Sequence, residues 1–100
     1  MSCYFIAQLS IKDKDEYQKY LNGFDSIFEK YEGEVISVDE NPVILEGEWD
    51  YSRLVIIRFT NAYEARRWYH SPEYQSLLQH RLKASAGTVL LTNDRSKDGD

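Results

Sequence analysis

The second half of the chain is organised by one stretch, Trp68-Tyr69-His70-Ser71-Pro72-Glu73-Tyr74-Gln75-Ser76-Leu77-Leu78-Gln79-His80-Arg81. Ser71-Pro72 divides its helical pattern, because Ser is a favoured N-cap residue and Pro suits the first position of a helix. Beyond this break, side chains repeat with the spacing of one helix face. The repeat consists of Tyr74, Leu77, Leu78, Arg81 and Leu82. The stretch therefore predicts two consecutive helices, the second of which carries a charged residue within an apolar stripe.

The first third of the chain predicts a strand followed by a long amphipathic helix. Residues 4–11 alternate between a wholly apolar face and a mixed one. Asp13 and Glu16 have the spacing of a capping box, which predicts the start of a helix. A stripe at helical spacing follows, made of Tyr17, Tyr20, Leu21, Phe24, Ile27, Phe28 and Tyr31. The helix is therefore expected to extend to about Tyr31, and Gly33 suits the left-handed residue that ends a helix.

The remaining segments predict three further strands and a short helix. Residues 34–40 alternate, Asn41-Pro42 interrupts them, and residues 43–47 resume an extended pattern. Residues 53–59 are apolar on both faces, as in a central strand. A second capping box, Asn61 with Glu64, starts the short helix. After the helix break, Gly87 is expected to close the last helix and residues 88–92 to form a short strand.

This order of elements predicts an α+β domain of the ferredoxin-like βαββαβ type. We expect residues 1–93 to form a four-stranded antiparallel sheet with the helices on one face, and residues 94–100 to be a disordered tail. The other face of the sheet is apolar too, at Ile6, Leu54 and Ile56. Because proteins seldom leave such a face in water, we predict a homodimer that packs sheet to sheet, a dimeric α/β barrel.

Composition limits the classes of function. The chain has 100 residues, 42% of them hydrophobic, which is enough for one domain with a core. The net charge of −5 and the scattered basic residues argue against nucleic-acid binding. A single cysteine, Cys3, allows no internal disulfide and no cysteine-based metal site. Neither a membrane span nor a signal-peptide pattern is present, so we expect a cytoplasmic protein without a membrane partner.

A longer set of residues is similar to a known family. The run of residues 68–75 with Arg81, together with weaker patterns at residues 4–13, 45–49 and 53–59, resembles domain of unknown function 1330 over residues 4–93. The resemblance implies a dimeric α/β-barrel subunit, and relatives by fold include cofactor-independent monooxygenases, muconolactone isomerase-like enzymes, haem-binding proteins and stress-related proteins. The family pattern often has Asp where this chain has His70, so a role for a carboxylate there does not carry over. Because one fold hosts many activities, the resemblance assigns no reaction.

Arg81 is the first candidate for a catalytic or binding residue. A guanidinium on a core-facing stripe needs an anionic partner, because an unpaired buried charge is costly. The partner is either the carboxylate or enolate of a ligand held between helix and sheet, or an internal carboxylate such as Glu46 or Glu48. A third alternative is that the Arg81 stem packs while its head group reaches water.

His70 is the second candidate catalytic residue, because its ring titrates near neutrality and suits a general base. The alternative is a surface histidine that favours a helix end. Candidate residues for the wall of a ligand pocket are Trp68, Tyr74, Glu46 and Trp49. The aromatic residues among them are more typical of a core or a dimer contact.

Two classes of function remain, neither with a cofactor. The two histidines are separated by Pro72 and cannot share a helix face, and no Gly-rich phosphate loop is present, so we expect no metal and no nucleotide. The first class is an enzyme of the cofactor-independent oxygenase or isomerase type, in which Arg81 holds a small apolar anion and His70 moves a proton. The alternative is a small-ligand-binding, stress-associated or structural dimer without catalysis. A pocket of a few hundred Å³ beside Arg81 would favour a ligand.

Overall fold

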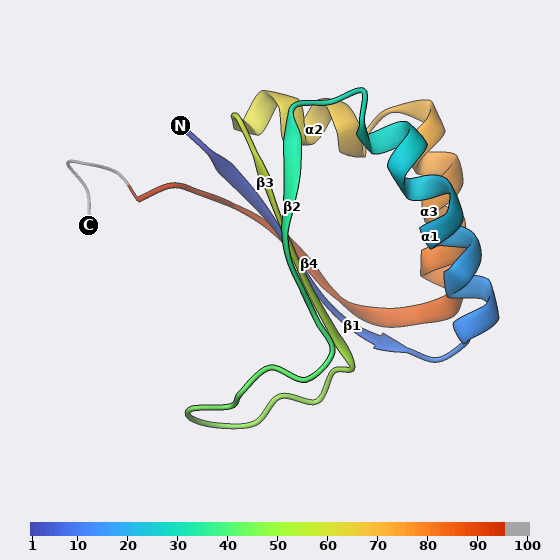
Figure 1. Ribbon diagram of the computed structural model, residues 1–100, viewed down its shortest axis with the longest axis vertical. Coiled ribbons are helices and arrows are strands. Elements are labelled where there is room, and N and C mark those ends of the chain that lie inside the picture. Colours follow the sequence, from blue (N-terminus) through green and yellow to red (C-terminus); the bar gives the residue numbers. More distant parts are fainter. Residues whose placement is uncertain (96–100) are drawn as a thin grey trace.

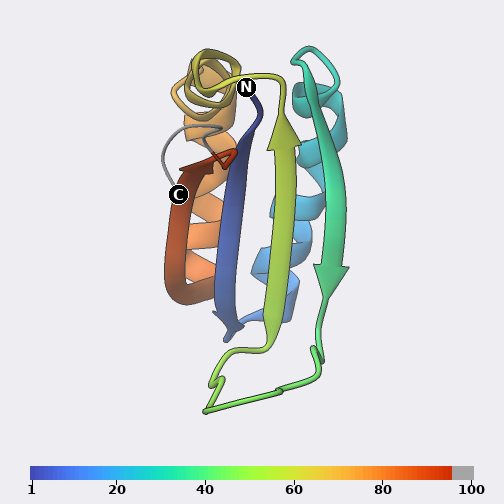
Figure 2. The same ribbon diagram turned by 90° about the vertical axis from the view of Figure 1, so that its left-hand side faces the viewer.

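The computed structural model describes residues 1–95. Its elements are β1 (Cys3–Ile11), α1 (Lys14–Phe28), β2 (Gly33–Asp39), β3 (Arg53–Phe59), α2 (Ala62–Tyr69), α3 (Pro72–Ala84) and β4 (Ser85–Asn93). The strands form one antiparallel sheet in the order β2-β3-β1-β4. The helices lie on one face of this sheet, and the opposite face is open (Figure 1, Figure 2). This arrangement confirms the predicted ferredoxin-like α+β fold.

β1 lies between β3 and β4, and its alternating side chains serve both faces of the sheet. The odd-numbered residues from Cys3 to Leu9 face the helices and are buried. On the open face, Ile6 is paired with Ile56 of β3 and with Leu90 of β4. Because opposed residues of antiparallel strands share a face, these three side chains form an apolar row across the open face.

The core between helices and sheet is built around Trp68 of α2, which is fully buried. Its ring lies edge-on to the rings of Phe5 and Phe28, at centroid distances of 5.2 and 5.8 Å. The ring of Tyr74 is closer, at 4.2 Å. Aromatic pairs of this kind stabilise a core beyond the area that they bury. Trp68 therefore joins β1, α1 and α3 in a single cluster.

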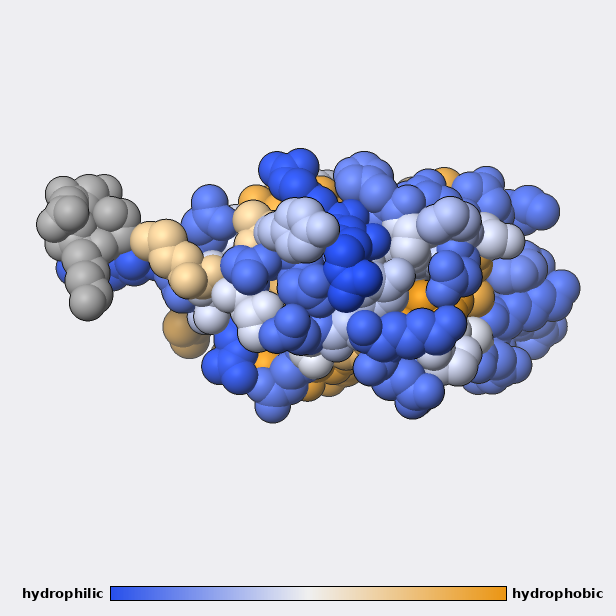
Figure 3. All heavy atoms as spheres, turned by 90° about the horizontal axis from the view of Figure 1, so that it is seen from above, coloured by the Kyte–Doolittle hydropathy of each residue, from blue (hydrophilic) through white to orange (hydrophobic). Residues whose placement is uncertain are grey.

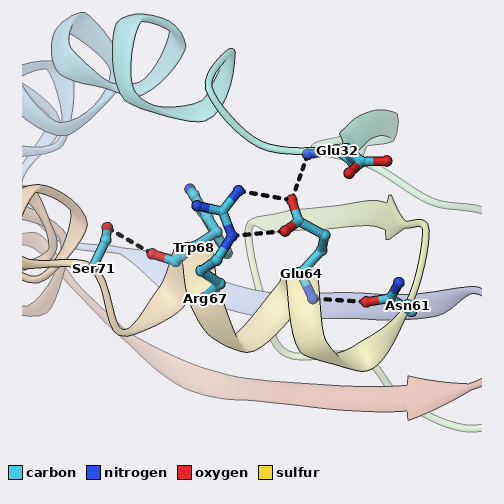
Figure 4. Close-up of polar contacts among 6 residues, drawn as sticks. All are labelled: Glu32, Asn61, Glu64, Arg67, Trp68 and Ser71. Carbon is cyan, nitrogen blue, oxygen red and sulfur yellow. Dashed lines mark hydrogen bonds and ion pairs between the residues drawn. The ribbon is translucent and has the colours of Figure 1, made fainter.

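The predicted helix break at Ser71-Pro72 is confirmed, since α2 ends at Tyr69 and α3 begins at Pro72. The Ser71 hydroxyl donates to the Trp68 carbonyl at 2.8 Å (Figure 4) and accepts from the Tyr74 N–H at 3.2 Å. One hydroxyl thus satisfies a carbonyl at the end of α2 and an N–H at the start of α3. The Tyr74 N–H, in the first turn of α3, would otherwise lack a partner within its helix, and the Trp68 carbonyl accepts from the Ser71 N–H as well, at 3.2 Å.

The predictions that Gly33 and Gly87 end helices are wrong. Gly33 begins β2, Gly87 lies within β4, and neither has a positive φ angle. A Cβ atom on Gly87 would lie 2.0 Å from the backbone oxygen of Gln8 in β1. The glycine is needed because two strands approach closely there, and a single-sequence pattern does not show such an approach.

Three element boundaries also differ from the prediction. α1 ends at Phe28, because the N–H groups of Lys30 and Tyr31 bond to carbonyls three residues earlier and tighten the chain into a turn. Residues 43–47 form no strand but part of an exposed loop, in which Gly47 has a φ of 81°. β4 is longer than predicted, because it pairs with the whole length of β1.

The two ends of the described chain are held together. The Asp94 N–H donates to the Ser2 carbonyl at 3.0 Å, and the Ser2 N–H donates to the Asp94 carboxylate at 2.7 Å. Of the tail predicted at residues 94–100, residues 96–100 lie outside the described part of the chain. Within the described part, no helix is both long and apolar enough to cross a membrane.

Glu64 connects α2 to the turn between α1 and β2. This end of the molecule is covered mainly by hydrophilic residues (Figure 3), yet Glu64 itself is buried. Its carboxylate accepts from Arg67 Nε at 2.7 Å and from the Glu32 N–H at 2.9 Å (Figure 4). The predicted Asn61 cap is confirmed by a bond of 2.8 Å from the Glu64 N–H. Hydrogen bonds from the Arg67 guanidinium and the Glu32 N–H lower the pKa of the Glu64 carboxyl.

We expect Glu64→Gln to lower the free energy of unfolding at neutral pH by about 1–3 kcal/mol, because it removes a charge-assisted pair at a buried site. The pKa of Glu64 is lowered in the folded state. Its contribution is therefore present above the ordinary Glu pKa of about 4.3 and is lost as the pH falls through the folded value. Urea unfolding of both proteins between about pH 7 and about pH 3 should show that the difference between their free energies of unfolding becomes smaller as the pH falls. A gap that does not depend on pH would contradict this assignment.

Candidate functional site

A cavity of about 350 Å³ lies between α1 and the helix-facing side of the sheet. Most of its wall is apolar, with Phe5, Phe24 and Val55 among the lining residues. α1 packs more closely against α3 than against the strands, which leaves this space open. Val35 and Val38 of the edge strand β2 also line the cavity and are exposed. The cavity therefore opens toward β2.

Arg81 reaches the cavity from α3 and is only 5% exposed. Among the described residues, no carboxylate lies within ion-pair distance of it. Its buried Nε–H also lacks a hydrogen-bond partner there. The guanidinium carbon lies 5.7 Å from the centre of the Tyr20 ring, a cation–π distance. The cavity wall thus carries a buried cation with an unused donor.

Two tyrosine hydroxyls lie beside this cation, one from α1 and one from α3. The Tyr20 and Tyr74 oxygens are 2.7 Å apart and share a hydrogen bond. Burial raises the pKa of both phenols, that of Tyr20 well above its ordinary value. Both are therefore neutral near pH 7 and can donate hydrogen bonds but cannot act as bases. We call Arg81, Tyr20 and Tyr74 the Arg81 cluster.

Arg81 is positively charged near pH 7, as arginine side chains in proteins are. Burial alone would lower the pKa of the guanidinium, but the phenol groups of Tyr74 and Tyr20 outweigh it and the pKa is raised. A fixed positive charge in an apolar cavity attracts an anion strongly, because little water is present to screen it. The arrangement can therefore bind a carboxylate, an enolate or a phenolate.

Arg53 and Tyr17 line the same cavity, although sequence patterns did not point to them. The Arg53 guanidinium carbon lies 5.4 Å from the centre of the Tyr17 ring. One signal was available, since Arg53 opens a predicted central strand whose alternation places it on the same side as Val55 and Ile57. A cation at a core-facing position of a central strand is as unusual as Arg81 on a core-facing helix stripe.

Trp68 and Tyr74, which were predicted to wall a ligand pocket, are both fully buried in the core. Neither lines the cavity. Tyr74 instead contacts the cavity wall indirectly, because its hydroxyl forms a hydrogen bond with the hydroxyl of Tyr20. The predicted stripe of α3 is buried only in part, because Leu82 is exposed next to the buried Arg81.

Glu46 and Trp49, the other two predicted pocket residues, lie in the loop between β2 and β3. The Trp49 Nε1–H donates to the Gln8 side chain at 3.0 Å. Gln8 is an even-numbered residue of β1, so Trp49 lies on the open face of the sheet, opposite the cavity. Glu46 is exposed and does not pair with Arg81.

His70, the predicted proton-transfer residue, is the exposed C-cap of α2. Its backbone N–H donates to the Arg66 carbonyl at 2.9 Å, and its ring lies 5.3 Å from that of Tyr69. His80 pairs with Glu16, with 2.6 Å between Nδ1 and the carboxylate. Neither histidine lines the cavity. The structure brings Arg81 to the cavity and leaves His70 at the surface.

Residues that could hold a metal ion do not converge in the described chain, where no group of three or more His, Cys, Asp or Glu side chains is placed for one. Cys3 is buried beneath the helices, and this burial raises the pKa of its thiol. A raised pKa leaves little reactive thiolate near pH 7.

A family profile matches almost the whole chain. The profile described as domain of unknown function (DUF1330) matches residues 2–94. The chain belongs to the DUF1330 family. A comparison with curated proteins finds no match.

Solved structures resemble the DUF1330 chain in fold at low sequence identity. A protein of unknown function from Rhodopseudomonas palustris has a TM-score of 0.77 and 14% identity, over 95% of this chain and 83% of that one. SnoaB, a cofactor-independent oxygenase from Streptomyces nogalater, has a TM-score of 0.67 and 15% identity, over 96% and 95%. A dimeric ferredoxin-like protein of unknown function from Thermobifida fusca has a TM-score of 0.62 and 12% identity, over 92% and 90%. These likenesses support the ferredoxin-like fold.

We expect the DUF1330 chain to lose stability at alkaline pH in a way that depends on Tyr20. The pKa of Tyr20 is raised in the folded state. Its contribution is therefore complete below the ordinary Tyr pKa of about 10 and is lost as the pH rises toward the folded value. Tyr20→Phe should cost about 1 kcal/mol near pH 8 through the lost hydrogen bond, but should lose less stability than wild type on going to about pH 11.

Urea unfolding at both pH values measures this difference. Tyr63→Phe is the matched control, because Tyr63 is exposed, and it should follow wild type. If Tyr20→Phe and Tyr63→Phe lose the same stability between the two pH values, the buried phenol is not the cause.

Proposed function

We propose that the cavity binds a small molecule with an apolar body and one anionic group, and that Arg81 holds the anion. The observation that carries the proposal is the burial of Arg81 without a carboxylate partner among the described residues, at the wall of a cavity of about 350 Å³. A buried charge in that state costs folding free energy, so a protein that retains it has a use for it.

The lining supports an apolar ligand body. Aromatic and aliphatic side chains from β1, β3 and α1 form most of the wall, with Phe5, Phe24, Val55 and Ile57 among them. Sites for small molecules commonly combine such a wall with a few polar groups that orient the ligand. Here those groups are the Arg81 guanidinium and the neutral Tyr20 hydroxyl beside it.

The reaction class that this arrangement supports is proton abstraction from carbon or oxygen, followed either by isomerisation or by cofactor-independent oxygenation with dioxygen as the oxidant. A fixed cation beside the substrate lowers the free energy of an enolate or phenolate more than that of the neutral substrate. Asp25 is the carboxylate among the lining residues of the cavity. It is exposed, as His70 is, but it borders the cavity and His70 does not, so it replaces His70 as the group placed to accept a proton there. The structural likeness to the oxygenase SnoaB favours this class by analogy of fold.

The alternative is ligand binding without catalysis. It uses the same cavity and the same Arg81 contact, and it differs only in the absence of turnover. A purely structural dimer would need neither the cavity nor the buried cation. The buried Arg81 at the cavity wall therefore favours the two ligand-binding functions over a purely structural one.

We further propose that the protein is a homodimer through the open sheet face. Ile6, Ile56 and Leu90 form an apolar row on that face, outside the reach of the helices. A second copy packed sheet to sheet would cover it with two-fold symmetry. The Thermobifida fusca protein of similar fold is described as dimeric, which supports this assembly.

The variant Arg81→Met tests whether Arg81 holds the anionic group of the ligand. We expect octanoate to raise the melting temperature of wild type, and by mass action about 2.7 kcal/mol is gained at a concentration 100 times the Kd. The variant should lose this response but be about as stable as wild type without ligand, because Met keeps an apolar stem and removes a buried charge that lacks a carboxylate partner among the described residues. Thermal unfolding with octanoate and with neutral octanamide measures both effects.

Arg66→Met is the control, since Arg66 is an exposed arginine of the neighbouring helix. It should keep the octanoate response. A large loss of stability in ligand-free Arg81→Met would instead assign Arg81 a structural role, and equal responses to octanoate and octanamide would remove the anion from the proposal.

Leu90→Glu tests the dimer, because it places a charge on the open sheet face. Leu82→Glu is the matched control, since Leu90 and Leu82 are 51% and 55% exposed but Leu82 lies on the outer side of α3. We expect wild type and Leu82→Glu to sediment as dimers at micromolar concentration and Leu90→Glu as a monomer. A monomeric wild type would refute sheet-to-sheet packing.

A further inference from the structure

Arg53 is a second mostly buried cation on the wall of the same cavity. It is the first residue of β3, and its register partner Leu9 faces the helices, so Arg53 leaves the sheet on the cavity side. Its Nε–H is buried and has no hydrogen-bond partner among the described residues. Like Arg81, Arg53 therefore presents an unused donor at the cavity.

The two cations flank a pair of tyrosine rings. The Arg53 guanidinium lies 5.4 Å from the centre of the Tyr17 ring, and the Arg81 guanidinium lies 5.7 Å from that of Tyr20. The two ring centres are 5.6 Å apart. Burial raises the pKa of Tyr17, while Arg53 and Arg81 both act to lower it, so both charges are felt at one phenol. Two like charges at one apolar cavity repel each other unless an anionic group lies close to each.

The internal partner of Arg53 is weakly held. Arg53 Nη1 lies 3.5 Å from the Glu40 carboxylate, and the Glu40 side chain is 72% exposed whereas that of Arg53 is 15% exposed. A long contact to an exposed carboxylate contributes little and is screened by salt. It also leaves the inner Nε–H of Arg53 without an acceptor. A ligand carboxylate could therefore replace Glu40 at small cost.

A second hollow, more polar than the first, meets the apolar cavity at Arg53. This hollow measures about 430 Å³ and shares Tyr17, Leu21 and Arg53 with the cavity. Its remaining wall includes Lys14, Gln18 and Glu40. An elongated ligand lying in the cavity would thus have one end at the buried Arg81 and the other at the border between apolar and polar surroundings. Such a border suits a second charged group.

We propose that Arg53 binds a second carboxylate of the ligand, so that the site selects an elongated dicarboxylate with an apolar middle, one carboxylate on Arg81 and the other on Arg53. Glu40 occupies Arg53 in the free protein and is displaced when the ligand binds. This inference rests on the proposed function, because it extends the ligand that Arg81 holds. A monocarboxylate would use Arg81 and leave Arg53 paired only with Glu40.

The test compares suberate with octanoate, two probes of equal chain length that differ in the second carboxylate. Isothermal titration should show suberate binding to wild type about tenfold more tightly or better, the gain expected of one charge-assisted contact. Arg53→Gln should abolish this advantage while changing the octanoate Kd by about twofold or less. Glu40→Gln should tighten suberate several-fold and leave octanoate unchanged, because it removes the competing carboxylate.

The outcomes separate this inference from the proposed function. If octanoate binds wild type through Arg81 but suberate has no advantage, or if Arg53→Gln weakens both probes equally, the second anchor is refuted and the proposed function stands. If neither probe binds wild type, both are refuted. Should Arg53→Gln fail to fold, Glu40→Gln decides alone, since Glu40 is exposed: suberate binding that is unchanged or weaker in this variant overturns the inference.

Discussion

The hydrogen bond between the Tyr20 and Tyr74 hydroxyls is the contact on which the site depends. It is 2.7 Å long, it is buried, and it joins α1 to α3. Because α1 packs against α3, α1 does not pack closely against the strands, and the cavity lies between α1 and the sheet. This bond pairs the two phenols with each other beside the Arg81 guanidinium, so neither hydroxyl needs a solvent partner. Helix packing and cavity chemistry therefore have one origin in this fold.

Two buried charged groups of this chain differ in how completely their bonding needs are met, and the difference points to function. Glu64 accepts from Arg67 and from the Glu32 backbone, so its burial is explained by the link it makes between α2 and the turn before β2. Arg81 is buried to the same extent but lacks a carboxylate and leaves its Nε–H without a partner among the described residues. A buried charge that only stabilised the fold would be fully satisfied, as Glu64 is. The incomplete bonding of Arg81 is therefore best explained by a ligand that completes it.

Local patterns in the sequence predicted the fold well, because strand alternation and helix caps depend on neighbouring residues. The Ser71-Pro72 break and the Asn61 cap were predictable for this reason, and so was the position of Arg81 on a buried stripe. Gly87 was misinterpreted because its role lies in the approach of β4 to β1. Tyr17 and Arg53 were missed for a similar reason, since the cavity arises from the way α1 leans on α3. A single-sequence pattern also could not predict that Trp49 lies on the open face of the sheet.

β1 couples the cavity to the open sheet face, because its side chains alternate between the two. Phe5 and Leu9 line the cavity, while Ile6 between them lies in the apolar row that would meet a partner subunit. A shift of one residue in register would exchange these sets, placing Ile6 in the cavity and Phe5 in the dimer contact. Gly87 opposes such a shift, since a Cβ atom at this position would lie 2.0 Å from the Gln8 backbone oxygen and only glycine fits there. The register of β1 and β4 thus sets the cavity wall and the open face together, and a ligand can bind on one side without rearranging the side chains on the other.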